Sequence, residues 1–378
     1  MPMETAGPVG GHTKTRIVDK DGGSGVYTSI QSAIDSLGTD GGVVYVEGKD
    51  GEGQEYTIAS PITVPSNVAL IGRGNVVIKI DASSDICAIR NSDYSNGNER
   101  ITVLGFHIKS RNTGQLNYEL VDFRKVKHCL LQDLTIDGIQ RNRAGISLGT
   151  ALSEGNRITN CTVSRCGHGI VLVPAGAGDG PERNSITGCT IYDCHVGIYM
   201  WRGHRNVVRG NVCRDTVPTG SDTTGHDGIL AEEGADNVFQ GNVCYHNCEH
   251  GIYISGTATG GSGGNTITGN DCYDNAGCGI HLCGQLNCDV HVNAIVGNIC
   301  CNNDVDGIAL DSYAKKNSVT GNICAYNSSY GIRELGTGSE ENIILGNICV
   351  NNALECDIKP RSGSNTIVEH NKGRPPPP

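Results

Sequence analysis

A repeated pattern constrains this chain more than any other feature of its sequence. Each copy begins with an asparagine and has an apolar residue two positions later. It continues with the run Gly-Asn-x-Cys, and Gly-Ile follows shortly afterwards. Successive copies start at Asn237, Asn265, Asn293 and Asn317, and are therefore spaced by 28, 28 and 24 residues. A period in this range is typical of a solenoid, in which each repeat forms one coil and packs only on its neighbours.

The alignment of the copies predicts how one coil is built. Side chains alternate along a strand, so Ile267 and Cys272 are expected to point inward. Gly269 and Asn270 mark a bend, because both residue types tolerate positive φ. A further column of asparagines is expected to form a buried ladder at a corner, with the amides stacked along the axis. This column consists of Asn247, Asn275, Asn303, Asn327 and Asn352.

The chain contains 18 cysteines, and the alignment places several of them in one column. These are Cys213, Cys244, Cys272, Cys300, Cys324 and Cys349. Free cysteine behaves as a small buried hydrophobe, so we expect a reduced ladder in the core. A disulfide framework is the alternative, although a chain of this length does not need one. Cys278, Cys283 and Cys288 lie near His281 but lack a paired C-x-x-C, so we assign no metal ligand.

The sequence divides into four segments. Residues 1–16 read as a flexible arm, and residues 17–63 as an N-terminal cap made of a short helix and the first strands. The helix is predicted from a capping-box pair, Thr28 and Gln31, and from an apolar stripe that ends at Gly38. Such a cap would cover the open edge of the stack. Residues 64–370 form the repeat body, and residues 371–378 form a Pro-rich tail.

Composition excludes several partners. Lys+Arg 29 against Asp+Glu 40 gives a net charge of −11, which argues against binding nucleic acid or an anionic membrane. No run approaches the roughly 18 apolar residues of a transmembrane helix. The first residues contain no apolar segment typical of a secretory signal. We nevertheless expect an extracellular or virion-associated protein, because lysis is one route of release that needs no signal.

The motif "GNxCxxN…GI", repeated between Asn206 and Asn352, resembles the right-handed parallel β-helix superfamily. It is most similar to the NosD-like and pectate-lyase-like repeats, and the resemblance covers roughly residues 17–370. It implies an all-β, single-stranded right-handed parallel β-helix with a short N-terminal capping helix. Members of the superfamily include polysaccharide lyases, glycoside hydrolases, mannuronan C5-epimerases, phage tailspikes and non-catalytic surface proteins. The resemblance therefore implies a fold and leaves the activity open.

The strand that contains Gly-Ile offers three columns that we expect to face outward: the residue before Gly, the residue after Ile and the residue two positions further on. Carboxylates, imidazoles and phenols gather there, and these groups perform acid–base chemistry near neutral pH. The candidate catalytic residues are Asp227, His250, Tyr253, His281, Asp306 and Asp311. The candidate substrate-binding residues are Tyr199, Trp201, Arg202, His204, Glu232 and Arg333. The alternative is that Asp227 and Asp306, each before a glycine, are simple turn residues.

Two functional hypotheses follow. In the first, the protein binds a polysaccharide along this face and acts on it as a lyase, hydrolase or uronate epimerase. A hydrolase would use two carboxylates, about 5–5.5 Å apart for retention or about 6.5–9.5 Å apart for inversion. A lyase or epimerase would use His250, His281 or Tyr253, with an arginine or Ca²⁺ neutralising the uronate carboxylate; no other cofactor is expected. No coil carries the Tyr-Gly-Phe-Asp-Pro-His motif of mannuronan epimerases. In the second hypothesis, the chain is a non-catalytic, tailspike-like protein that forms a homo-oligomer.

Overall fold

The computed structural model describes residues 14–49, 51, 53–110, 118–149, 153–174, 176, 178, 180–218, 225–354 and 357–373, with the side chains of 139–142 left out. Most of the predicted arm and most of the predicted tail lie outside this set. Strand β1 (Thr15–Val18) already begins within the predicted arm 1–16. Lys372 still donates its N–H to the carbonyl of Asn347 at 2.8 Å. The stack therefore extends past the predicted boundary at residue 370.

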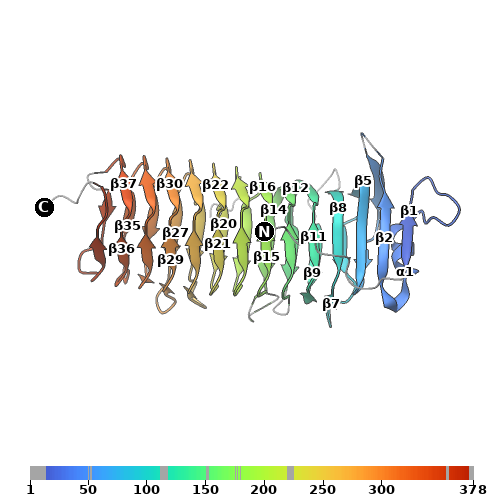
Figure 1. Cartoon of the computed structure of the whole chain (residues 1–378), viewed down its shortest axis with the longest axis horizontal. Helices are drawn as coiled ribbons and strands as arrows, with labels where there is room; N and C mark the ends of the chain where they lie inside the picture. Colours follow the sequence, from blue (N-terminus) through green and yellow to red (C-terminus); the bar gives the residue numbers. More distant parts are fainter. Residues whose placement is uncertain are drawn as a thin grey trace, which may run out of the picture.

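The chain is a right-handed parallel β-solenoid of about 12 turns, as predicted. Its coils follow one another along the long axis from β1 to β39 (Figure 1). Each regular coil contributes three short strands, and each strand pairs in parallel with its counterpart on the next coil. The long strands β5 (Val68–Ile80), β8 (Thr102–Lys109), β12 (Thr135–Gly149) and β14 (Thr162–Val173) turn corners and join these faces.

The first face contains, besides parts of β5 and β8, the first strand of each coil. Its strands are β1, β2 (Gly42–Glu47), β11 (Leu130–Gln132), β13 (Arg157–Thr159), β15 (Ser185–Thr187), β18 (Val207–Arg209), β21 (Val238–Gln240), β25 (Thr266–Thr268), β29 (Ala294–Val296), β33 (Ser318–Thr320), β36 (Ile343–Leu345) and β39 (Ile367–Glu369).

The second face carries the cysteine column and includes parts of β5, β8, β12 and β14. Its other strands are β3 (Gln54–Ile58), β16 (Thr190–Tyr192), β19 (Val212–Arg214), β22 (Val243–Tyr245), β26 (Asp271–Tyr273), β30 (Ile299–Cys301), β34 (Ile323–Ala325) and β37 (Ile348–Val350).

The third face, here named the Gly-Ile sheet, includes the ends of β12 and β14. Its other strands are β4 (Ile62–Val64), β6 (Ile89–Asn91), β9 (Val121–Arg124), β17 (Val196–Trp201), β20 (Ile229–Glu232), β23 (Ile252–Ser255), β27 (Ile280–Cys283), β31 (Ile308–Leu310), β35 (Ile332–Glu334) and β38 (Ile358–Lys359). Short strands pair at corners: β7 (Asn98–Glu99) with β10 (Val126–Lys127), and β24 (Ser262–Gly263) with β28 (Val290–His291) and then β32 (Ala314–Lys315).

The N-terminal helix is shorter than predicted. Helix α1 spans only Ile30–Asp35, and a single 3₁₀ turn, η1 (Gly38–Asp40), follows it. The predicted capping box is wrong: the N-cap is Ser29, whose hydroxyl accepts the N–H of Ser32. The Gln31 side chain instead accepts the N–H of Thr63 at 2.8 Å. The helix packs against β1, β2 and β4, so it covers only a small part of the N-terminal end.

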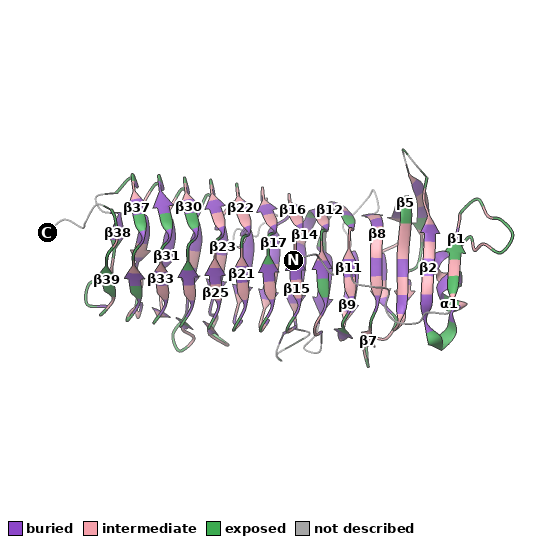
Figure 2. Cartoon of the chain, in the orientation of Figure 1, coloured by how far each residue is buried: buried purple, intermediate pink, exposed green. Residues whose placement is uncertain are grey.

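The cysteine column is a buried ladder, as predicted. Cys213, Cys244, Cys272, Cys300 and Cys324 each align with the next on successive coils. Their side chains are fully buried, and every cysteine in the described part of the chain is unbridged. Buried and half-buried residues alternate along these strands, which places the core inside the coil (Figure 2). Cys356 lies outside the described residues.

Asparagine ladders hold the corners, and there are three of them among the described residues rather than the single one predicted. Asn242 shows the pattern: its N–H and its Nδ2–H both donate to Oδ1 of Asn270 on the next coil at 2.9 Å. Its Nδ2 also donates to the carbonyl of Val208 on the preceding coil at 2.9 Å. Each asparagine thus satisfies backbone groups that would otherwise be buried without partners. The other ladders run through Asn237 and Asn275.

Native thiol labelling should distinguish the ladder from the surface. Cys248 is exposed, so iodoacetamide should label it in the folded protein and leave the ladder unlabelled. Contact with the preceding thiol, together with burial, raises the pKa of Cys244 and Cys272, so the reactive thiolate is scarce there. Mass spectrometry before and after denaturation measures the difference. Ladder cysteines found in disulfides, or labelled as fast as Cys248, would contradict this structure.

The asparagine ladder can be tested by Asn270→Ala. The change strands two buried donors of Asn242, and should cost about 2–4 kcal/mol in the free energy of unfolding. Urea denaturation measures this cost. Thr268→Ala, on the neighbouring strand β25, is the control and should cost much less. Equal losses of stability in the two variants would show that Asn270 has no special role at the corner.

Candidate functional site

The residues that follow Gly-Ile form an outward column on consecutive strands of the Gly-Ile sheet. Tyr199 aligns with Leu230, Leu230 with Tyr253, and Tyr253 with His281. The column continues through Ala309 to Arg333. A second outward column contains Trp201, Glu232, Ser255 and Cys283. The predicted alignment of Tyr199, Trp201, Glu232, Tyr253, His281 and Arg333 on this face is therefore confirmed.

The third predicted column, the residue before Gly, does not face outward. Asp227 and Asp306 are fully buried, and His250 is only 9% exposed. The strands begin at the isoleucine, so the residue before Gly lies on the corner, where strand alternation no longer applies. Asp227 Oδ1 accepts the N–H of His250 at 2.9 Å, and Asp306 Oδ1 accepts the N–H of Tyr330 at 3.0 Å. The turn interpretation of these two aspartates is the one that the structure supports.

The remaining oxygens of these aspartates differ in their partners. Asp306 Oδ2 accepts from Nε of Arg333 at 2.7 Å and lies 2.7 Å from its Nη2, so the charge of Arg333 is neutralised. Within the described part of the chain, Asp227 Oδ2 is buried and has no hydrogen-bond partner. Burial, followed by the nearby Glu249, raises the pKa of Asp227 well above its usual value. Neither carboxylate is free to meet a substrate.

His250 and His281 form a chain of hydrogen bonds with a fixed direction. His250 Nδ1 accepts the N–H of Cys278 at 2.9 Å, so its proton lies on Nε2. That Nε2 lies 2.9 Å from Nδ1 of His281 and therefore donates to it. The proton of His281 is then on its own Nε2, 3.6 Å from Asp311 Oδ2. Hydrogen bonding from His281 lowers the pKa of Asp311, which is thus an ionised acceptor at the outer end.

Tyr253 and Tyr199 belong to two aromatic clusters on this face. Tyr253 stacks on His281 with ring centroids 4.9 Å apart and an interplanar angle of 11°. Burial raises the pKa of Tyr253, so its phenol stays protonated at neutral pH. Tyr199 donates its hydroxyl to Glu232 at 2.6 Å and stacks on His168 at 5.3 Å. Both phenols are therefore held in one orientation.

Arg202 and His204 have local partners. The Arg202 guanidinium lies 4.8 Å from the Trp201 ring and donates through Nε to Glu233 at 2.6 Å. His204 follows the strand on a corner, where its Nδ1 accepts the N–H of Ala235 at 3.2 Å. Arg202 thus extends the outer face beside Trp201, whereas His204 serves the stack.

Two histidines beside this face were missed by sequence reasoning. The rings of His195 and His226 meet at 4.4 Å, and both side chains are buried. Each lies two positions before a Gly-Ile glycine, as Glu249 does. Aligning the residue two positions before the glycine as one more column of the repeat would have identified them.

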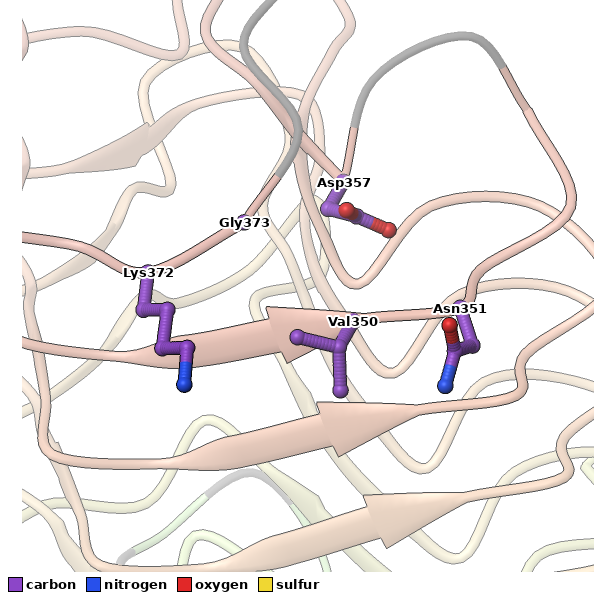
Figure 3. A pocket seen from close by; sticks show the side chains of 5 residues that line it. All are labelled: Val350, Asn351, Asp357, Lys372 and Gly373. Carbon is purple, nitrogen blue, oxygen red and sulfur yellow. The ribbon is translucent and has the colours of Figure 1, made fainter.

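A cavity of about 460 Å³ lies on the last coil. Figure 3 shows its lining residues, Val350, Asn351, Asp357, Lys372 and Gly373. Asp357 accepts from N and Nδ2 of Asn352 at 3.1 and 3.0 Å, and so continues an asparagine ladder at the C-terminal end. Its carboxylate therefore belongs to the stack.

Comparison with known proteins supports the fold. The family model described as "Periplasmic copper-binding protein (NosD)" matches residues 98–303. The A-module of the mannuronan C-5 epimerase AlgE4 of Azotobacter vinelandii is 18% identical, with a TM-score of 0.52, over 90% of this chain and 82% of that one. The periplasmic alginate epimerase AlgG is 14% identical, with a TM-score of 0.64, over 83% and 76%. The Dettilon tailspike protein is 17% identical, with a TM-score of 0.60, over 90% and 62%. At these identities the solved structures share the fold alone.

Neither a curated relative nor a membrane-spanning helix is found for the described chain. None of the curated proteins matches this chain. Among the described residues, no helix has the length and apolar character needed to cross a membrane.

Copper, which the family description names, has one candidate set of donors in the described part of the chain. Ligand atoms of His281, Cys283 and Asp311 lie within 4.8 Å of one another. His281 would have to bind through Nε2, because His250 occupies its Nδ1. The hydrogen-bond direction places a proton on that same Nε2, and a metal ion would require its loss or a turn of the His250 ring. The arrangement seen here therefore does not fit a resident copper ion.

His250 should make folding stability depend on pH. Burial, followed by the nearby His281, lowers the pKa of His250 well below its usual value, so the native state keeps it neutral. Below about pH 6.5 the unfolded chain binds a proton at this residue that the native state does not. Stability should therefore fall on acidification, by up to ~1.4 kcal/mol per pH unit from this group.

Urea denaturation at about pH 7 and about pH 5 measures this dependence. His250→Gln retains an amide oxygen that can accept the Cys278 N–H but cannot titrate. The variant should therefore lose less stability than the native protein over this range. Equal losses would show that His250 is not the group responsible.

Proposed function

This chain belongs to the NosD family of parallel β-helix proteins, and from that premise we propose that it binds a polysaccharide along the Gly-Ile sheet. The observation that carries the proposal is the in-register outward column Tyr199, Leu230, Tyr253 and His281. Successive coils repeat every ~4.8 Å, so equivalent side chains recur along the axis at a spacing that suits a linear polymer. Such a ligand would place the protein outside the cytoplasm, in the periplasm, in the extracellular medium or on a virion.

The chemistry of the column supports a sugar ligand. Trp201 and the two tyrosines offer aromatic surface with a polar edge, and Arg202 adds a guanidinium that is held in place by Glu233. His281 has both ring nitrogens engaged within the protein, so it offers the ligand a flat ring surface stacked on Tyr253. The phenols, the indole and the guanidinium are groups suited to hydroxyl-rich ligands. The similar solved structures include two alginate epimerases and a tailspike.

Hydrolysis by the predicted carboxylates is disfavoured. Asp227 and Asp306 are buried in corner hydrogen bonds, which leaves Glu232 and Asp311. Glu232 aligns with Ser255, and Ser255 with Cys283, whose neighbour on the following coil is Asp311. Three coil steps correspond to about 14 Å, beyond the roughly 6.5–9.5 Å of inverting glycosidases.

Proton transfer on a uronate is the second candidate, favoured by the stacked Tyr253 and His281 beside Asp311. The raised pKa of Tyr253 keeps its phenol protonated at neutral pH, which is the state from which a proton donor of a lyase or epimerase would act. Incubation with alginate, followed by ultraviolet absorbance for unsaturated ends and NMR for C5 inversion, tests this reaction. An absence of both products would leave the non-catalytic binding role.

Polysaccharide binding should depend on Tyr253. Affinity electrophoresis in gels containing alginate or polygalacturonate measures the affinity, and Tyr253→Ala should weaken it roughly tenfold through the loss of aromatic contact. Tyr273→Ala is the matched control, because Tyr273 stacks on Tyr245 at 5.0 Å on the second face. If both variants bound equally well, or if no polymer retarded the native protein, the proposed function would be wrong.

A further inference from the structure

A cavity of about 340 Å³ opens at the N-terminal end of the Gly-Ile sheet. Arg90 on β6 aligns with Asp122 on β9, and Asp122 aligns with Ser147 on β12. Ser147 in turn aligns with Val171, which pairs with Tyr199. The floor of the cavity therefore belongs to the same outward column as the candidate site. Asp122 lies five coil steps from Tyr253, or about 24 Å along the axis, and Arg90 lies one step further away.

One side of the cavity is a rigid polar cluster. Asp122 is 2% exposed and accepts the Tyr94 hydroxyl at 2.8 Å. The Arg124 guanidinium donates to the same carboxylate through Nε at 3.1 Å and Nη2 at 2.7 Å. Arg124 also lies 4.5 Å from the Tyr94 ring centroid. The charges of Asp122 and Arg124 cancel, and the contacts of Tyr94 with both residues fix the position of its ring.

The other side of the cavity presents the guanidinium of Arg90. Among the described residues its Nε is buried and makes no hydrogen bond, and the group lies over the Tyr94 ring at 5.5 Å. A buried unpaired donor costs free energy, and in native proteins such a donor is commonly completed by a ligand, an ion or an ordered water. Asp85 also lines the cavity and has an interaction of its own.

We propose that this cavity binds the anionic group of a sugar, with Arg90 pairing to a carboxylate or sulfate and the Tyr94 ring against the sugar. Asp85 supplies an acceptor for ring hydroxyls, and Tyr118 borders the opening. The volume suits a single sugar unit and falls at the lower end of the usual range for small-ligand sites. The proposal rests on the proposed function only in taking a sugar as the carrier of the anion.

The position of the cavity gives it a role distinct from that of the Tyr253 and His281 region. It lies toward the N-terminal end of the outward column, where Thr63 is the neighbour of Arg90 on the preceding coil, whereas Tyr253 and His281 lie in mid-sheet. Ser147 and Val171, which separate the cavity from Tyr199, are only 4% and 5% exposed, so the cavity would take one sugar unit by itself. Cys87, also in the lining, remains a neutral thiol, because burial raises its pKa to about 11. It therefore neither repels the anion nor attacks it.

Saturation-transfer NMR on the full chain, with glucuronate and glucose as ligands and inorganic sulfate as a competitor, tests the proposal. Glucuronate should bind the native protein, and Arg90→Gln should weaken it roughly tenfold or more by removing the charged donor. Arg209→Gln, an exposed arginine on β18 of the first face, is the matched control and should have no effect. Arg90→Gln should also unfold at a temperature no lower than the native protein, because an unpaired buried donor is removed.

Each outcome has a clear reading. Unchanged glucuronate binding in Arg90→Gln would overturn the site. Glucose binding as tightly as glucuronate would overturn the role of the anion, and sulfate competing as well as glucuronate would reduce the site to a general anion pocket and overturn the sugar assignment. If no polymer retarded the native protein in affinity electrophoresis but glucuronate still bound it, the proposed function would be wrong and the binding site in this cavity would be supported.

Discussion

Hydrogen bonds at the corners are the interactions on which the rest of this structure depends. A parallel strand pairs along its length, but a coil must also turn, and each turn buries backbone groups that the sheet does not satisfy. Asparagine solves this problem by bonding in both directions along the axis, as Asn242 does with Asn270 ahead and Val208 behind. The corners thus hold successive coils in one register. Every column of side chains, inside or outside, follows from that register.

The same constraint decides which ionisable groups are free for function. At the corner before the Gly-Ile sheet, Asp227, His250 and Asp306 take the place of asparagine and accept backbone N–H groups of the next coil. Their acidic and imidazole character looks catalytic in the sequence, yet all three side chains are buried and each already accepts a backbone N–H. Chemistry at the surface is left to the outward columns, where Tyr253 and His281 lie in mid-sheet. Arg90 lies at the N-terminal end of the same column.

Sequence reasoning reached the solenoid, the cysteine ladder and one asparagine ladder because identical residues recur at a fixed spacing. Cys244 and Asn275 could be assigned in this way without any coordinates. It failed at Asp227 and Asp306, because the in-and-out alternation of a strand was assumed to hold for these residues as well. They lie on a corner before the strand begins, where side chains do not alternate in this way. It also missed the cavity at Arg90 and Tyr94. Those residues lie in the early coils, where the spacing is irregular and no repeat column connects Arg90 with Tyr94 and Arg124.

The central claim is that a polysaccharide lies along the Gly-Ile sheet, and hydroxyl-radical footprinting tests it most directly. The protein would be oxidised with and without bound alginate, and modification would be read residue by residue by mass spectrometry. The account predicts protection of Tyr199, Trp201 and Tyr253 on this sheet, and unchanged oxidation of Tyr245 and Tyr273 on the second face. Protection of Tyr245 and Tyr273, with Tyr253 unaffected, would contradict it.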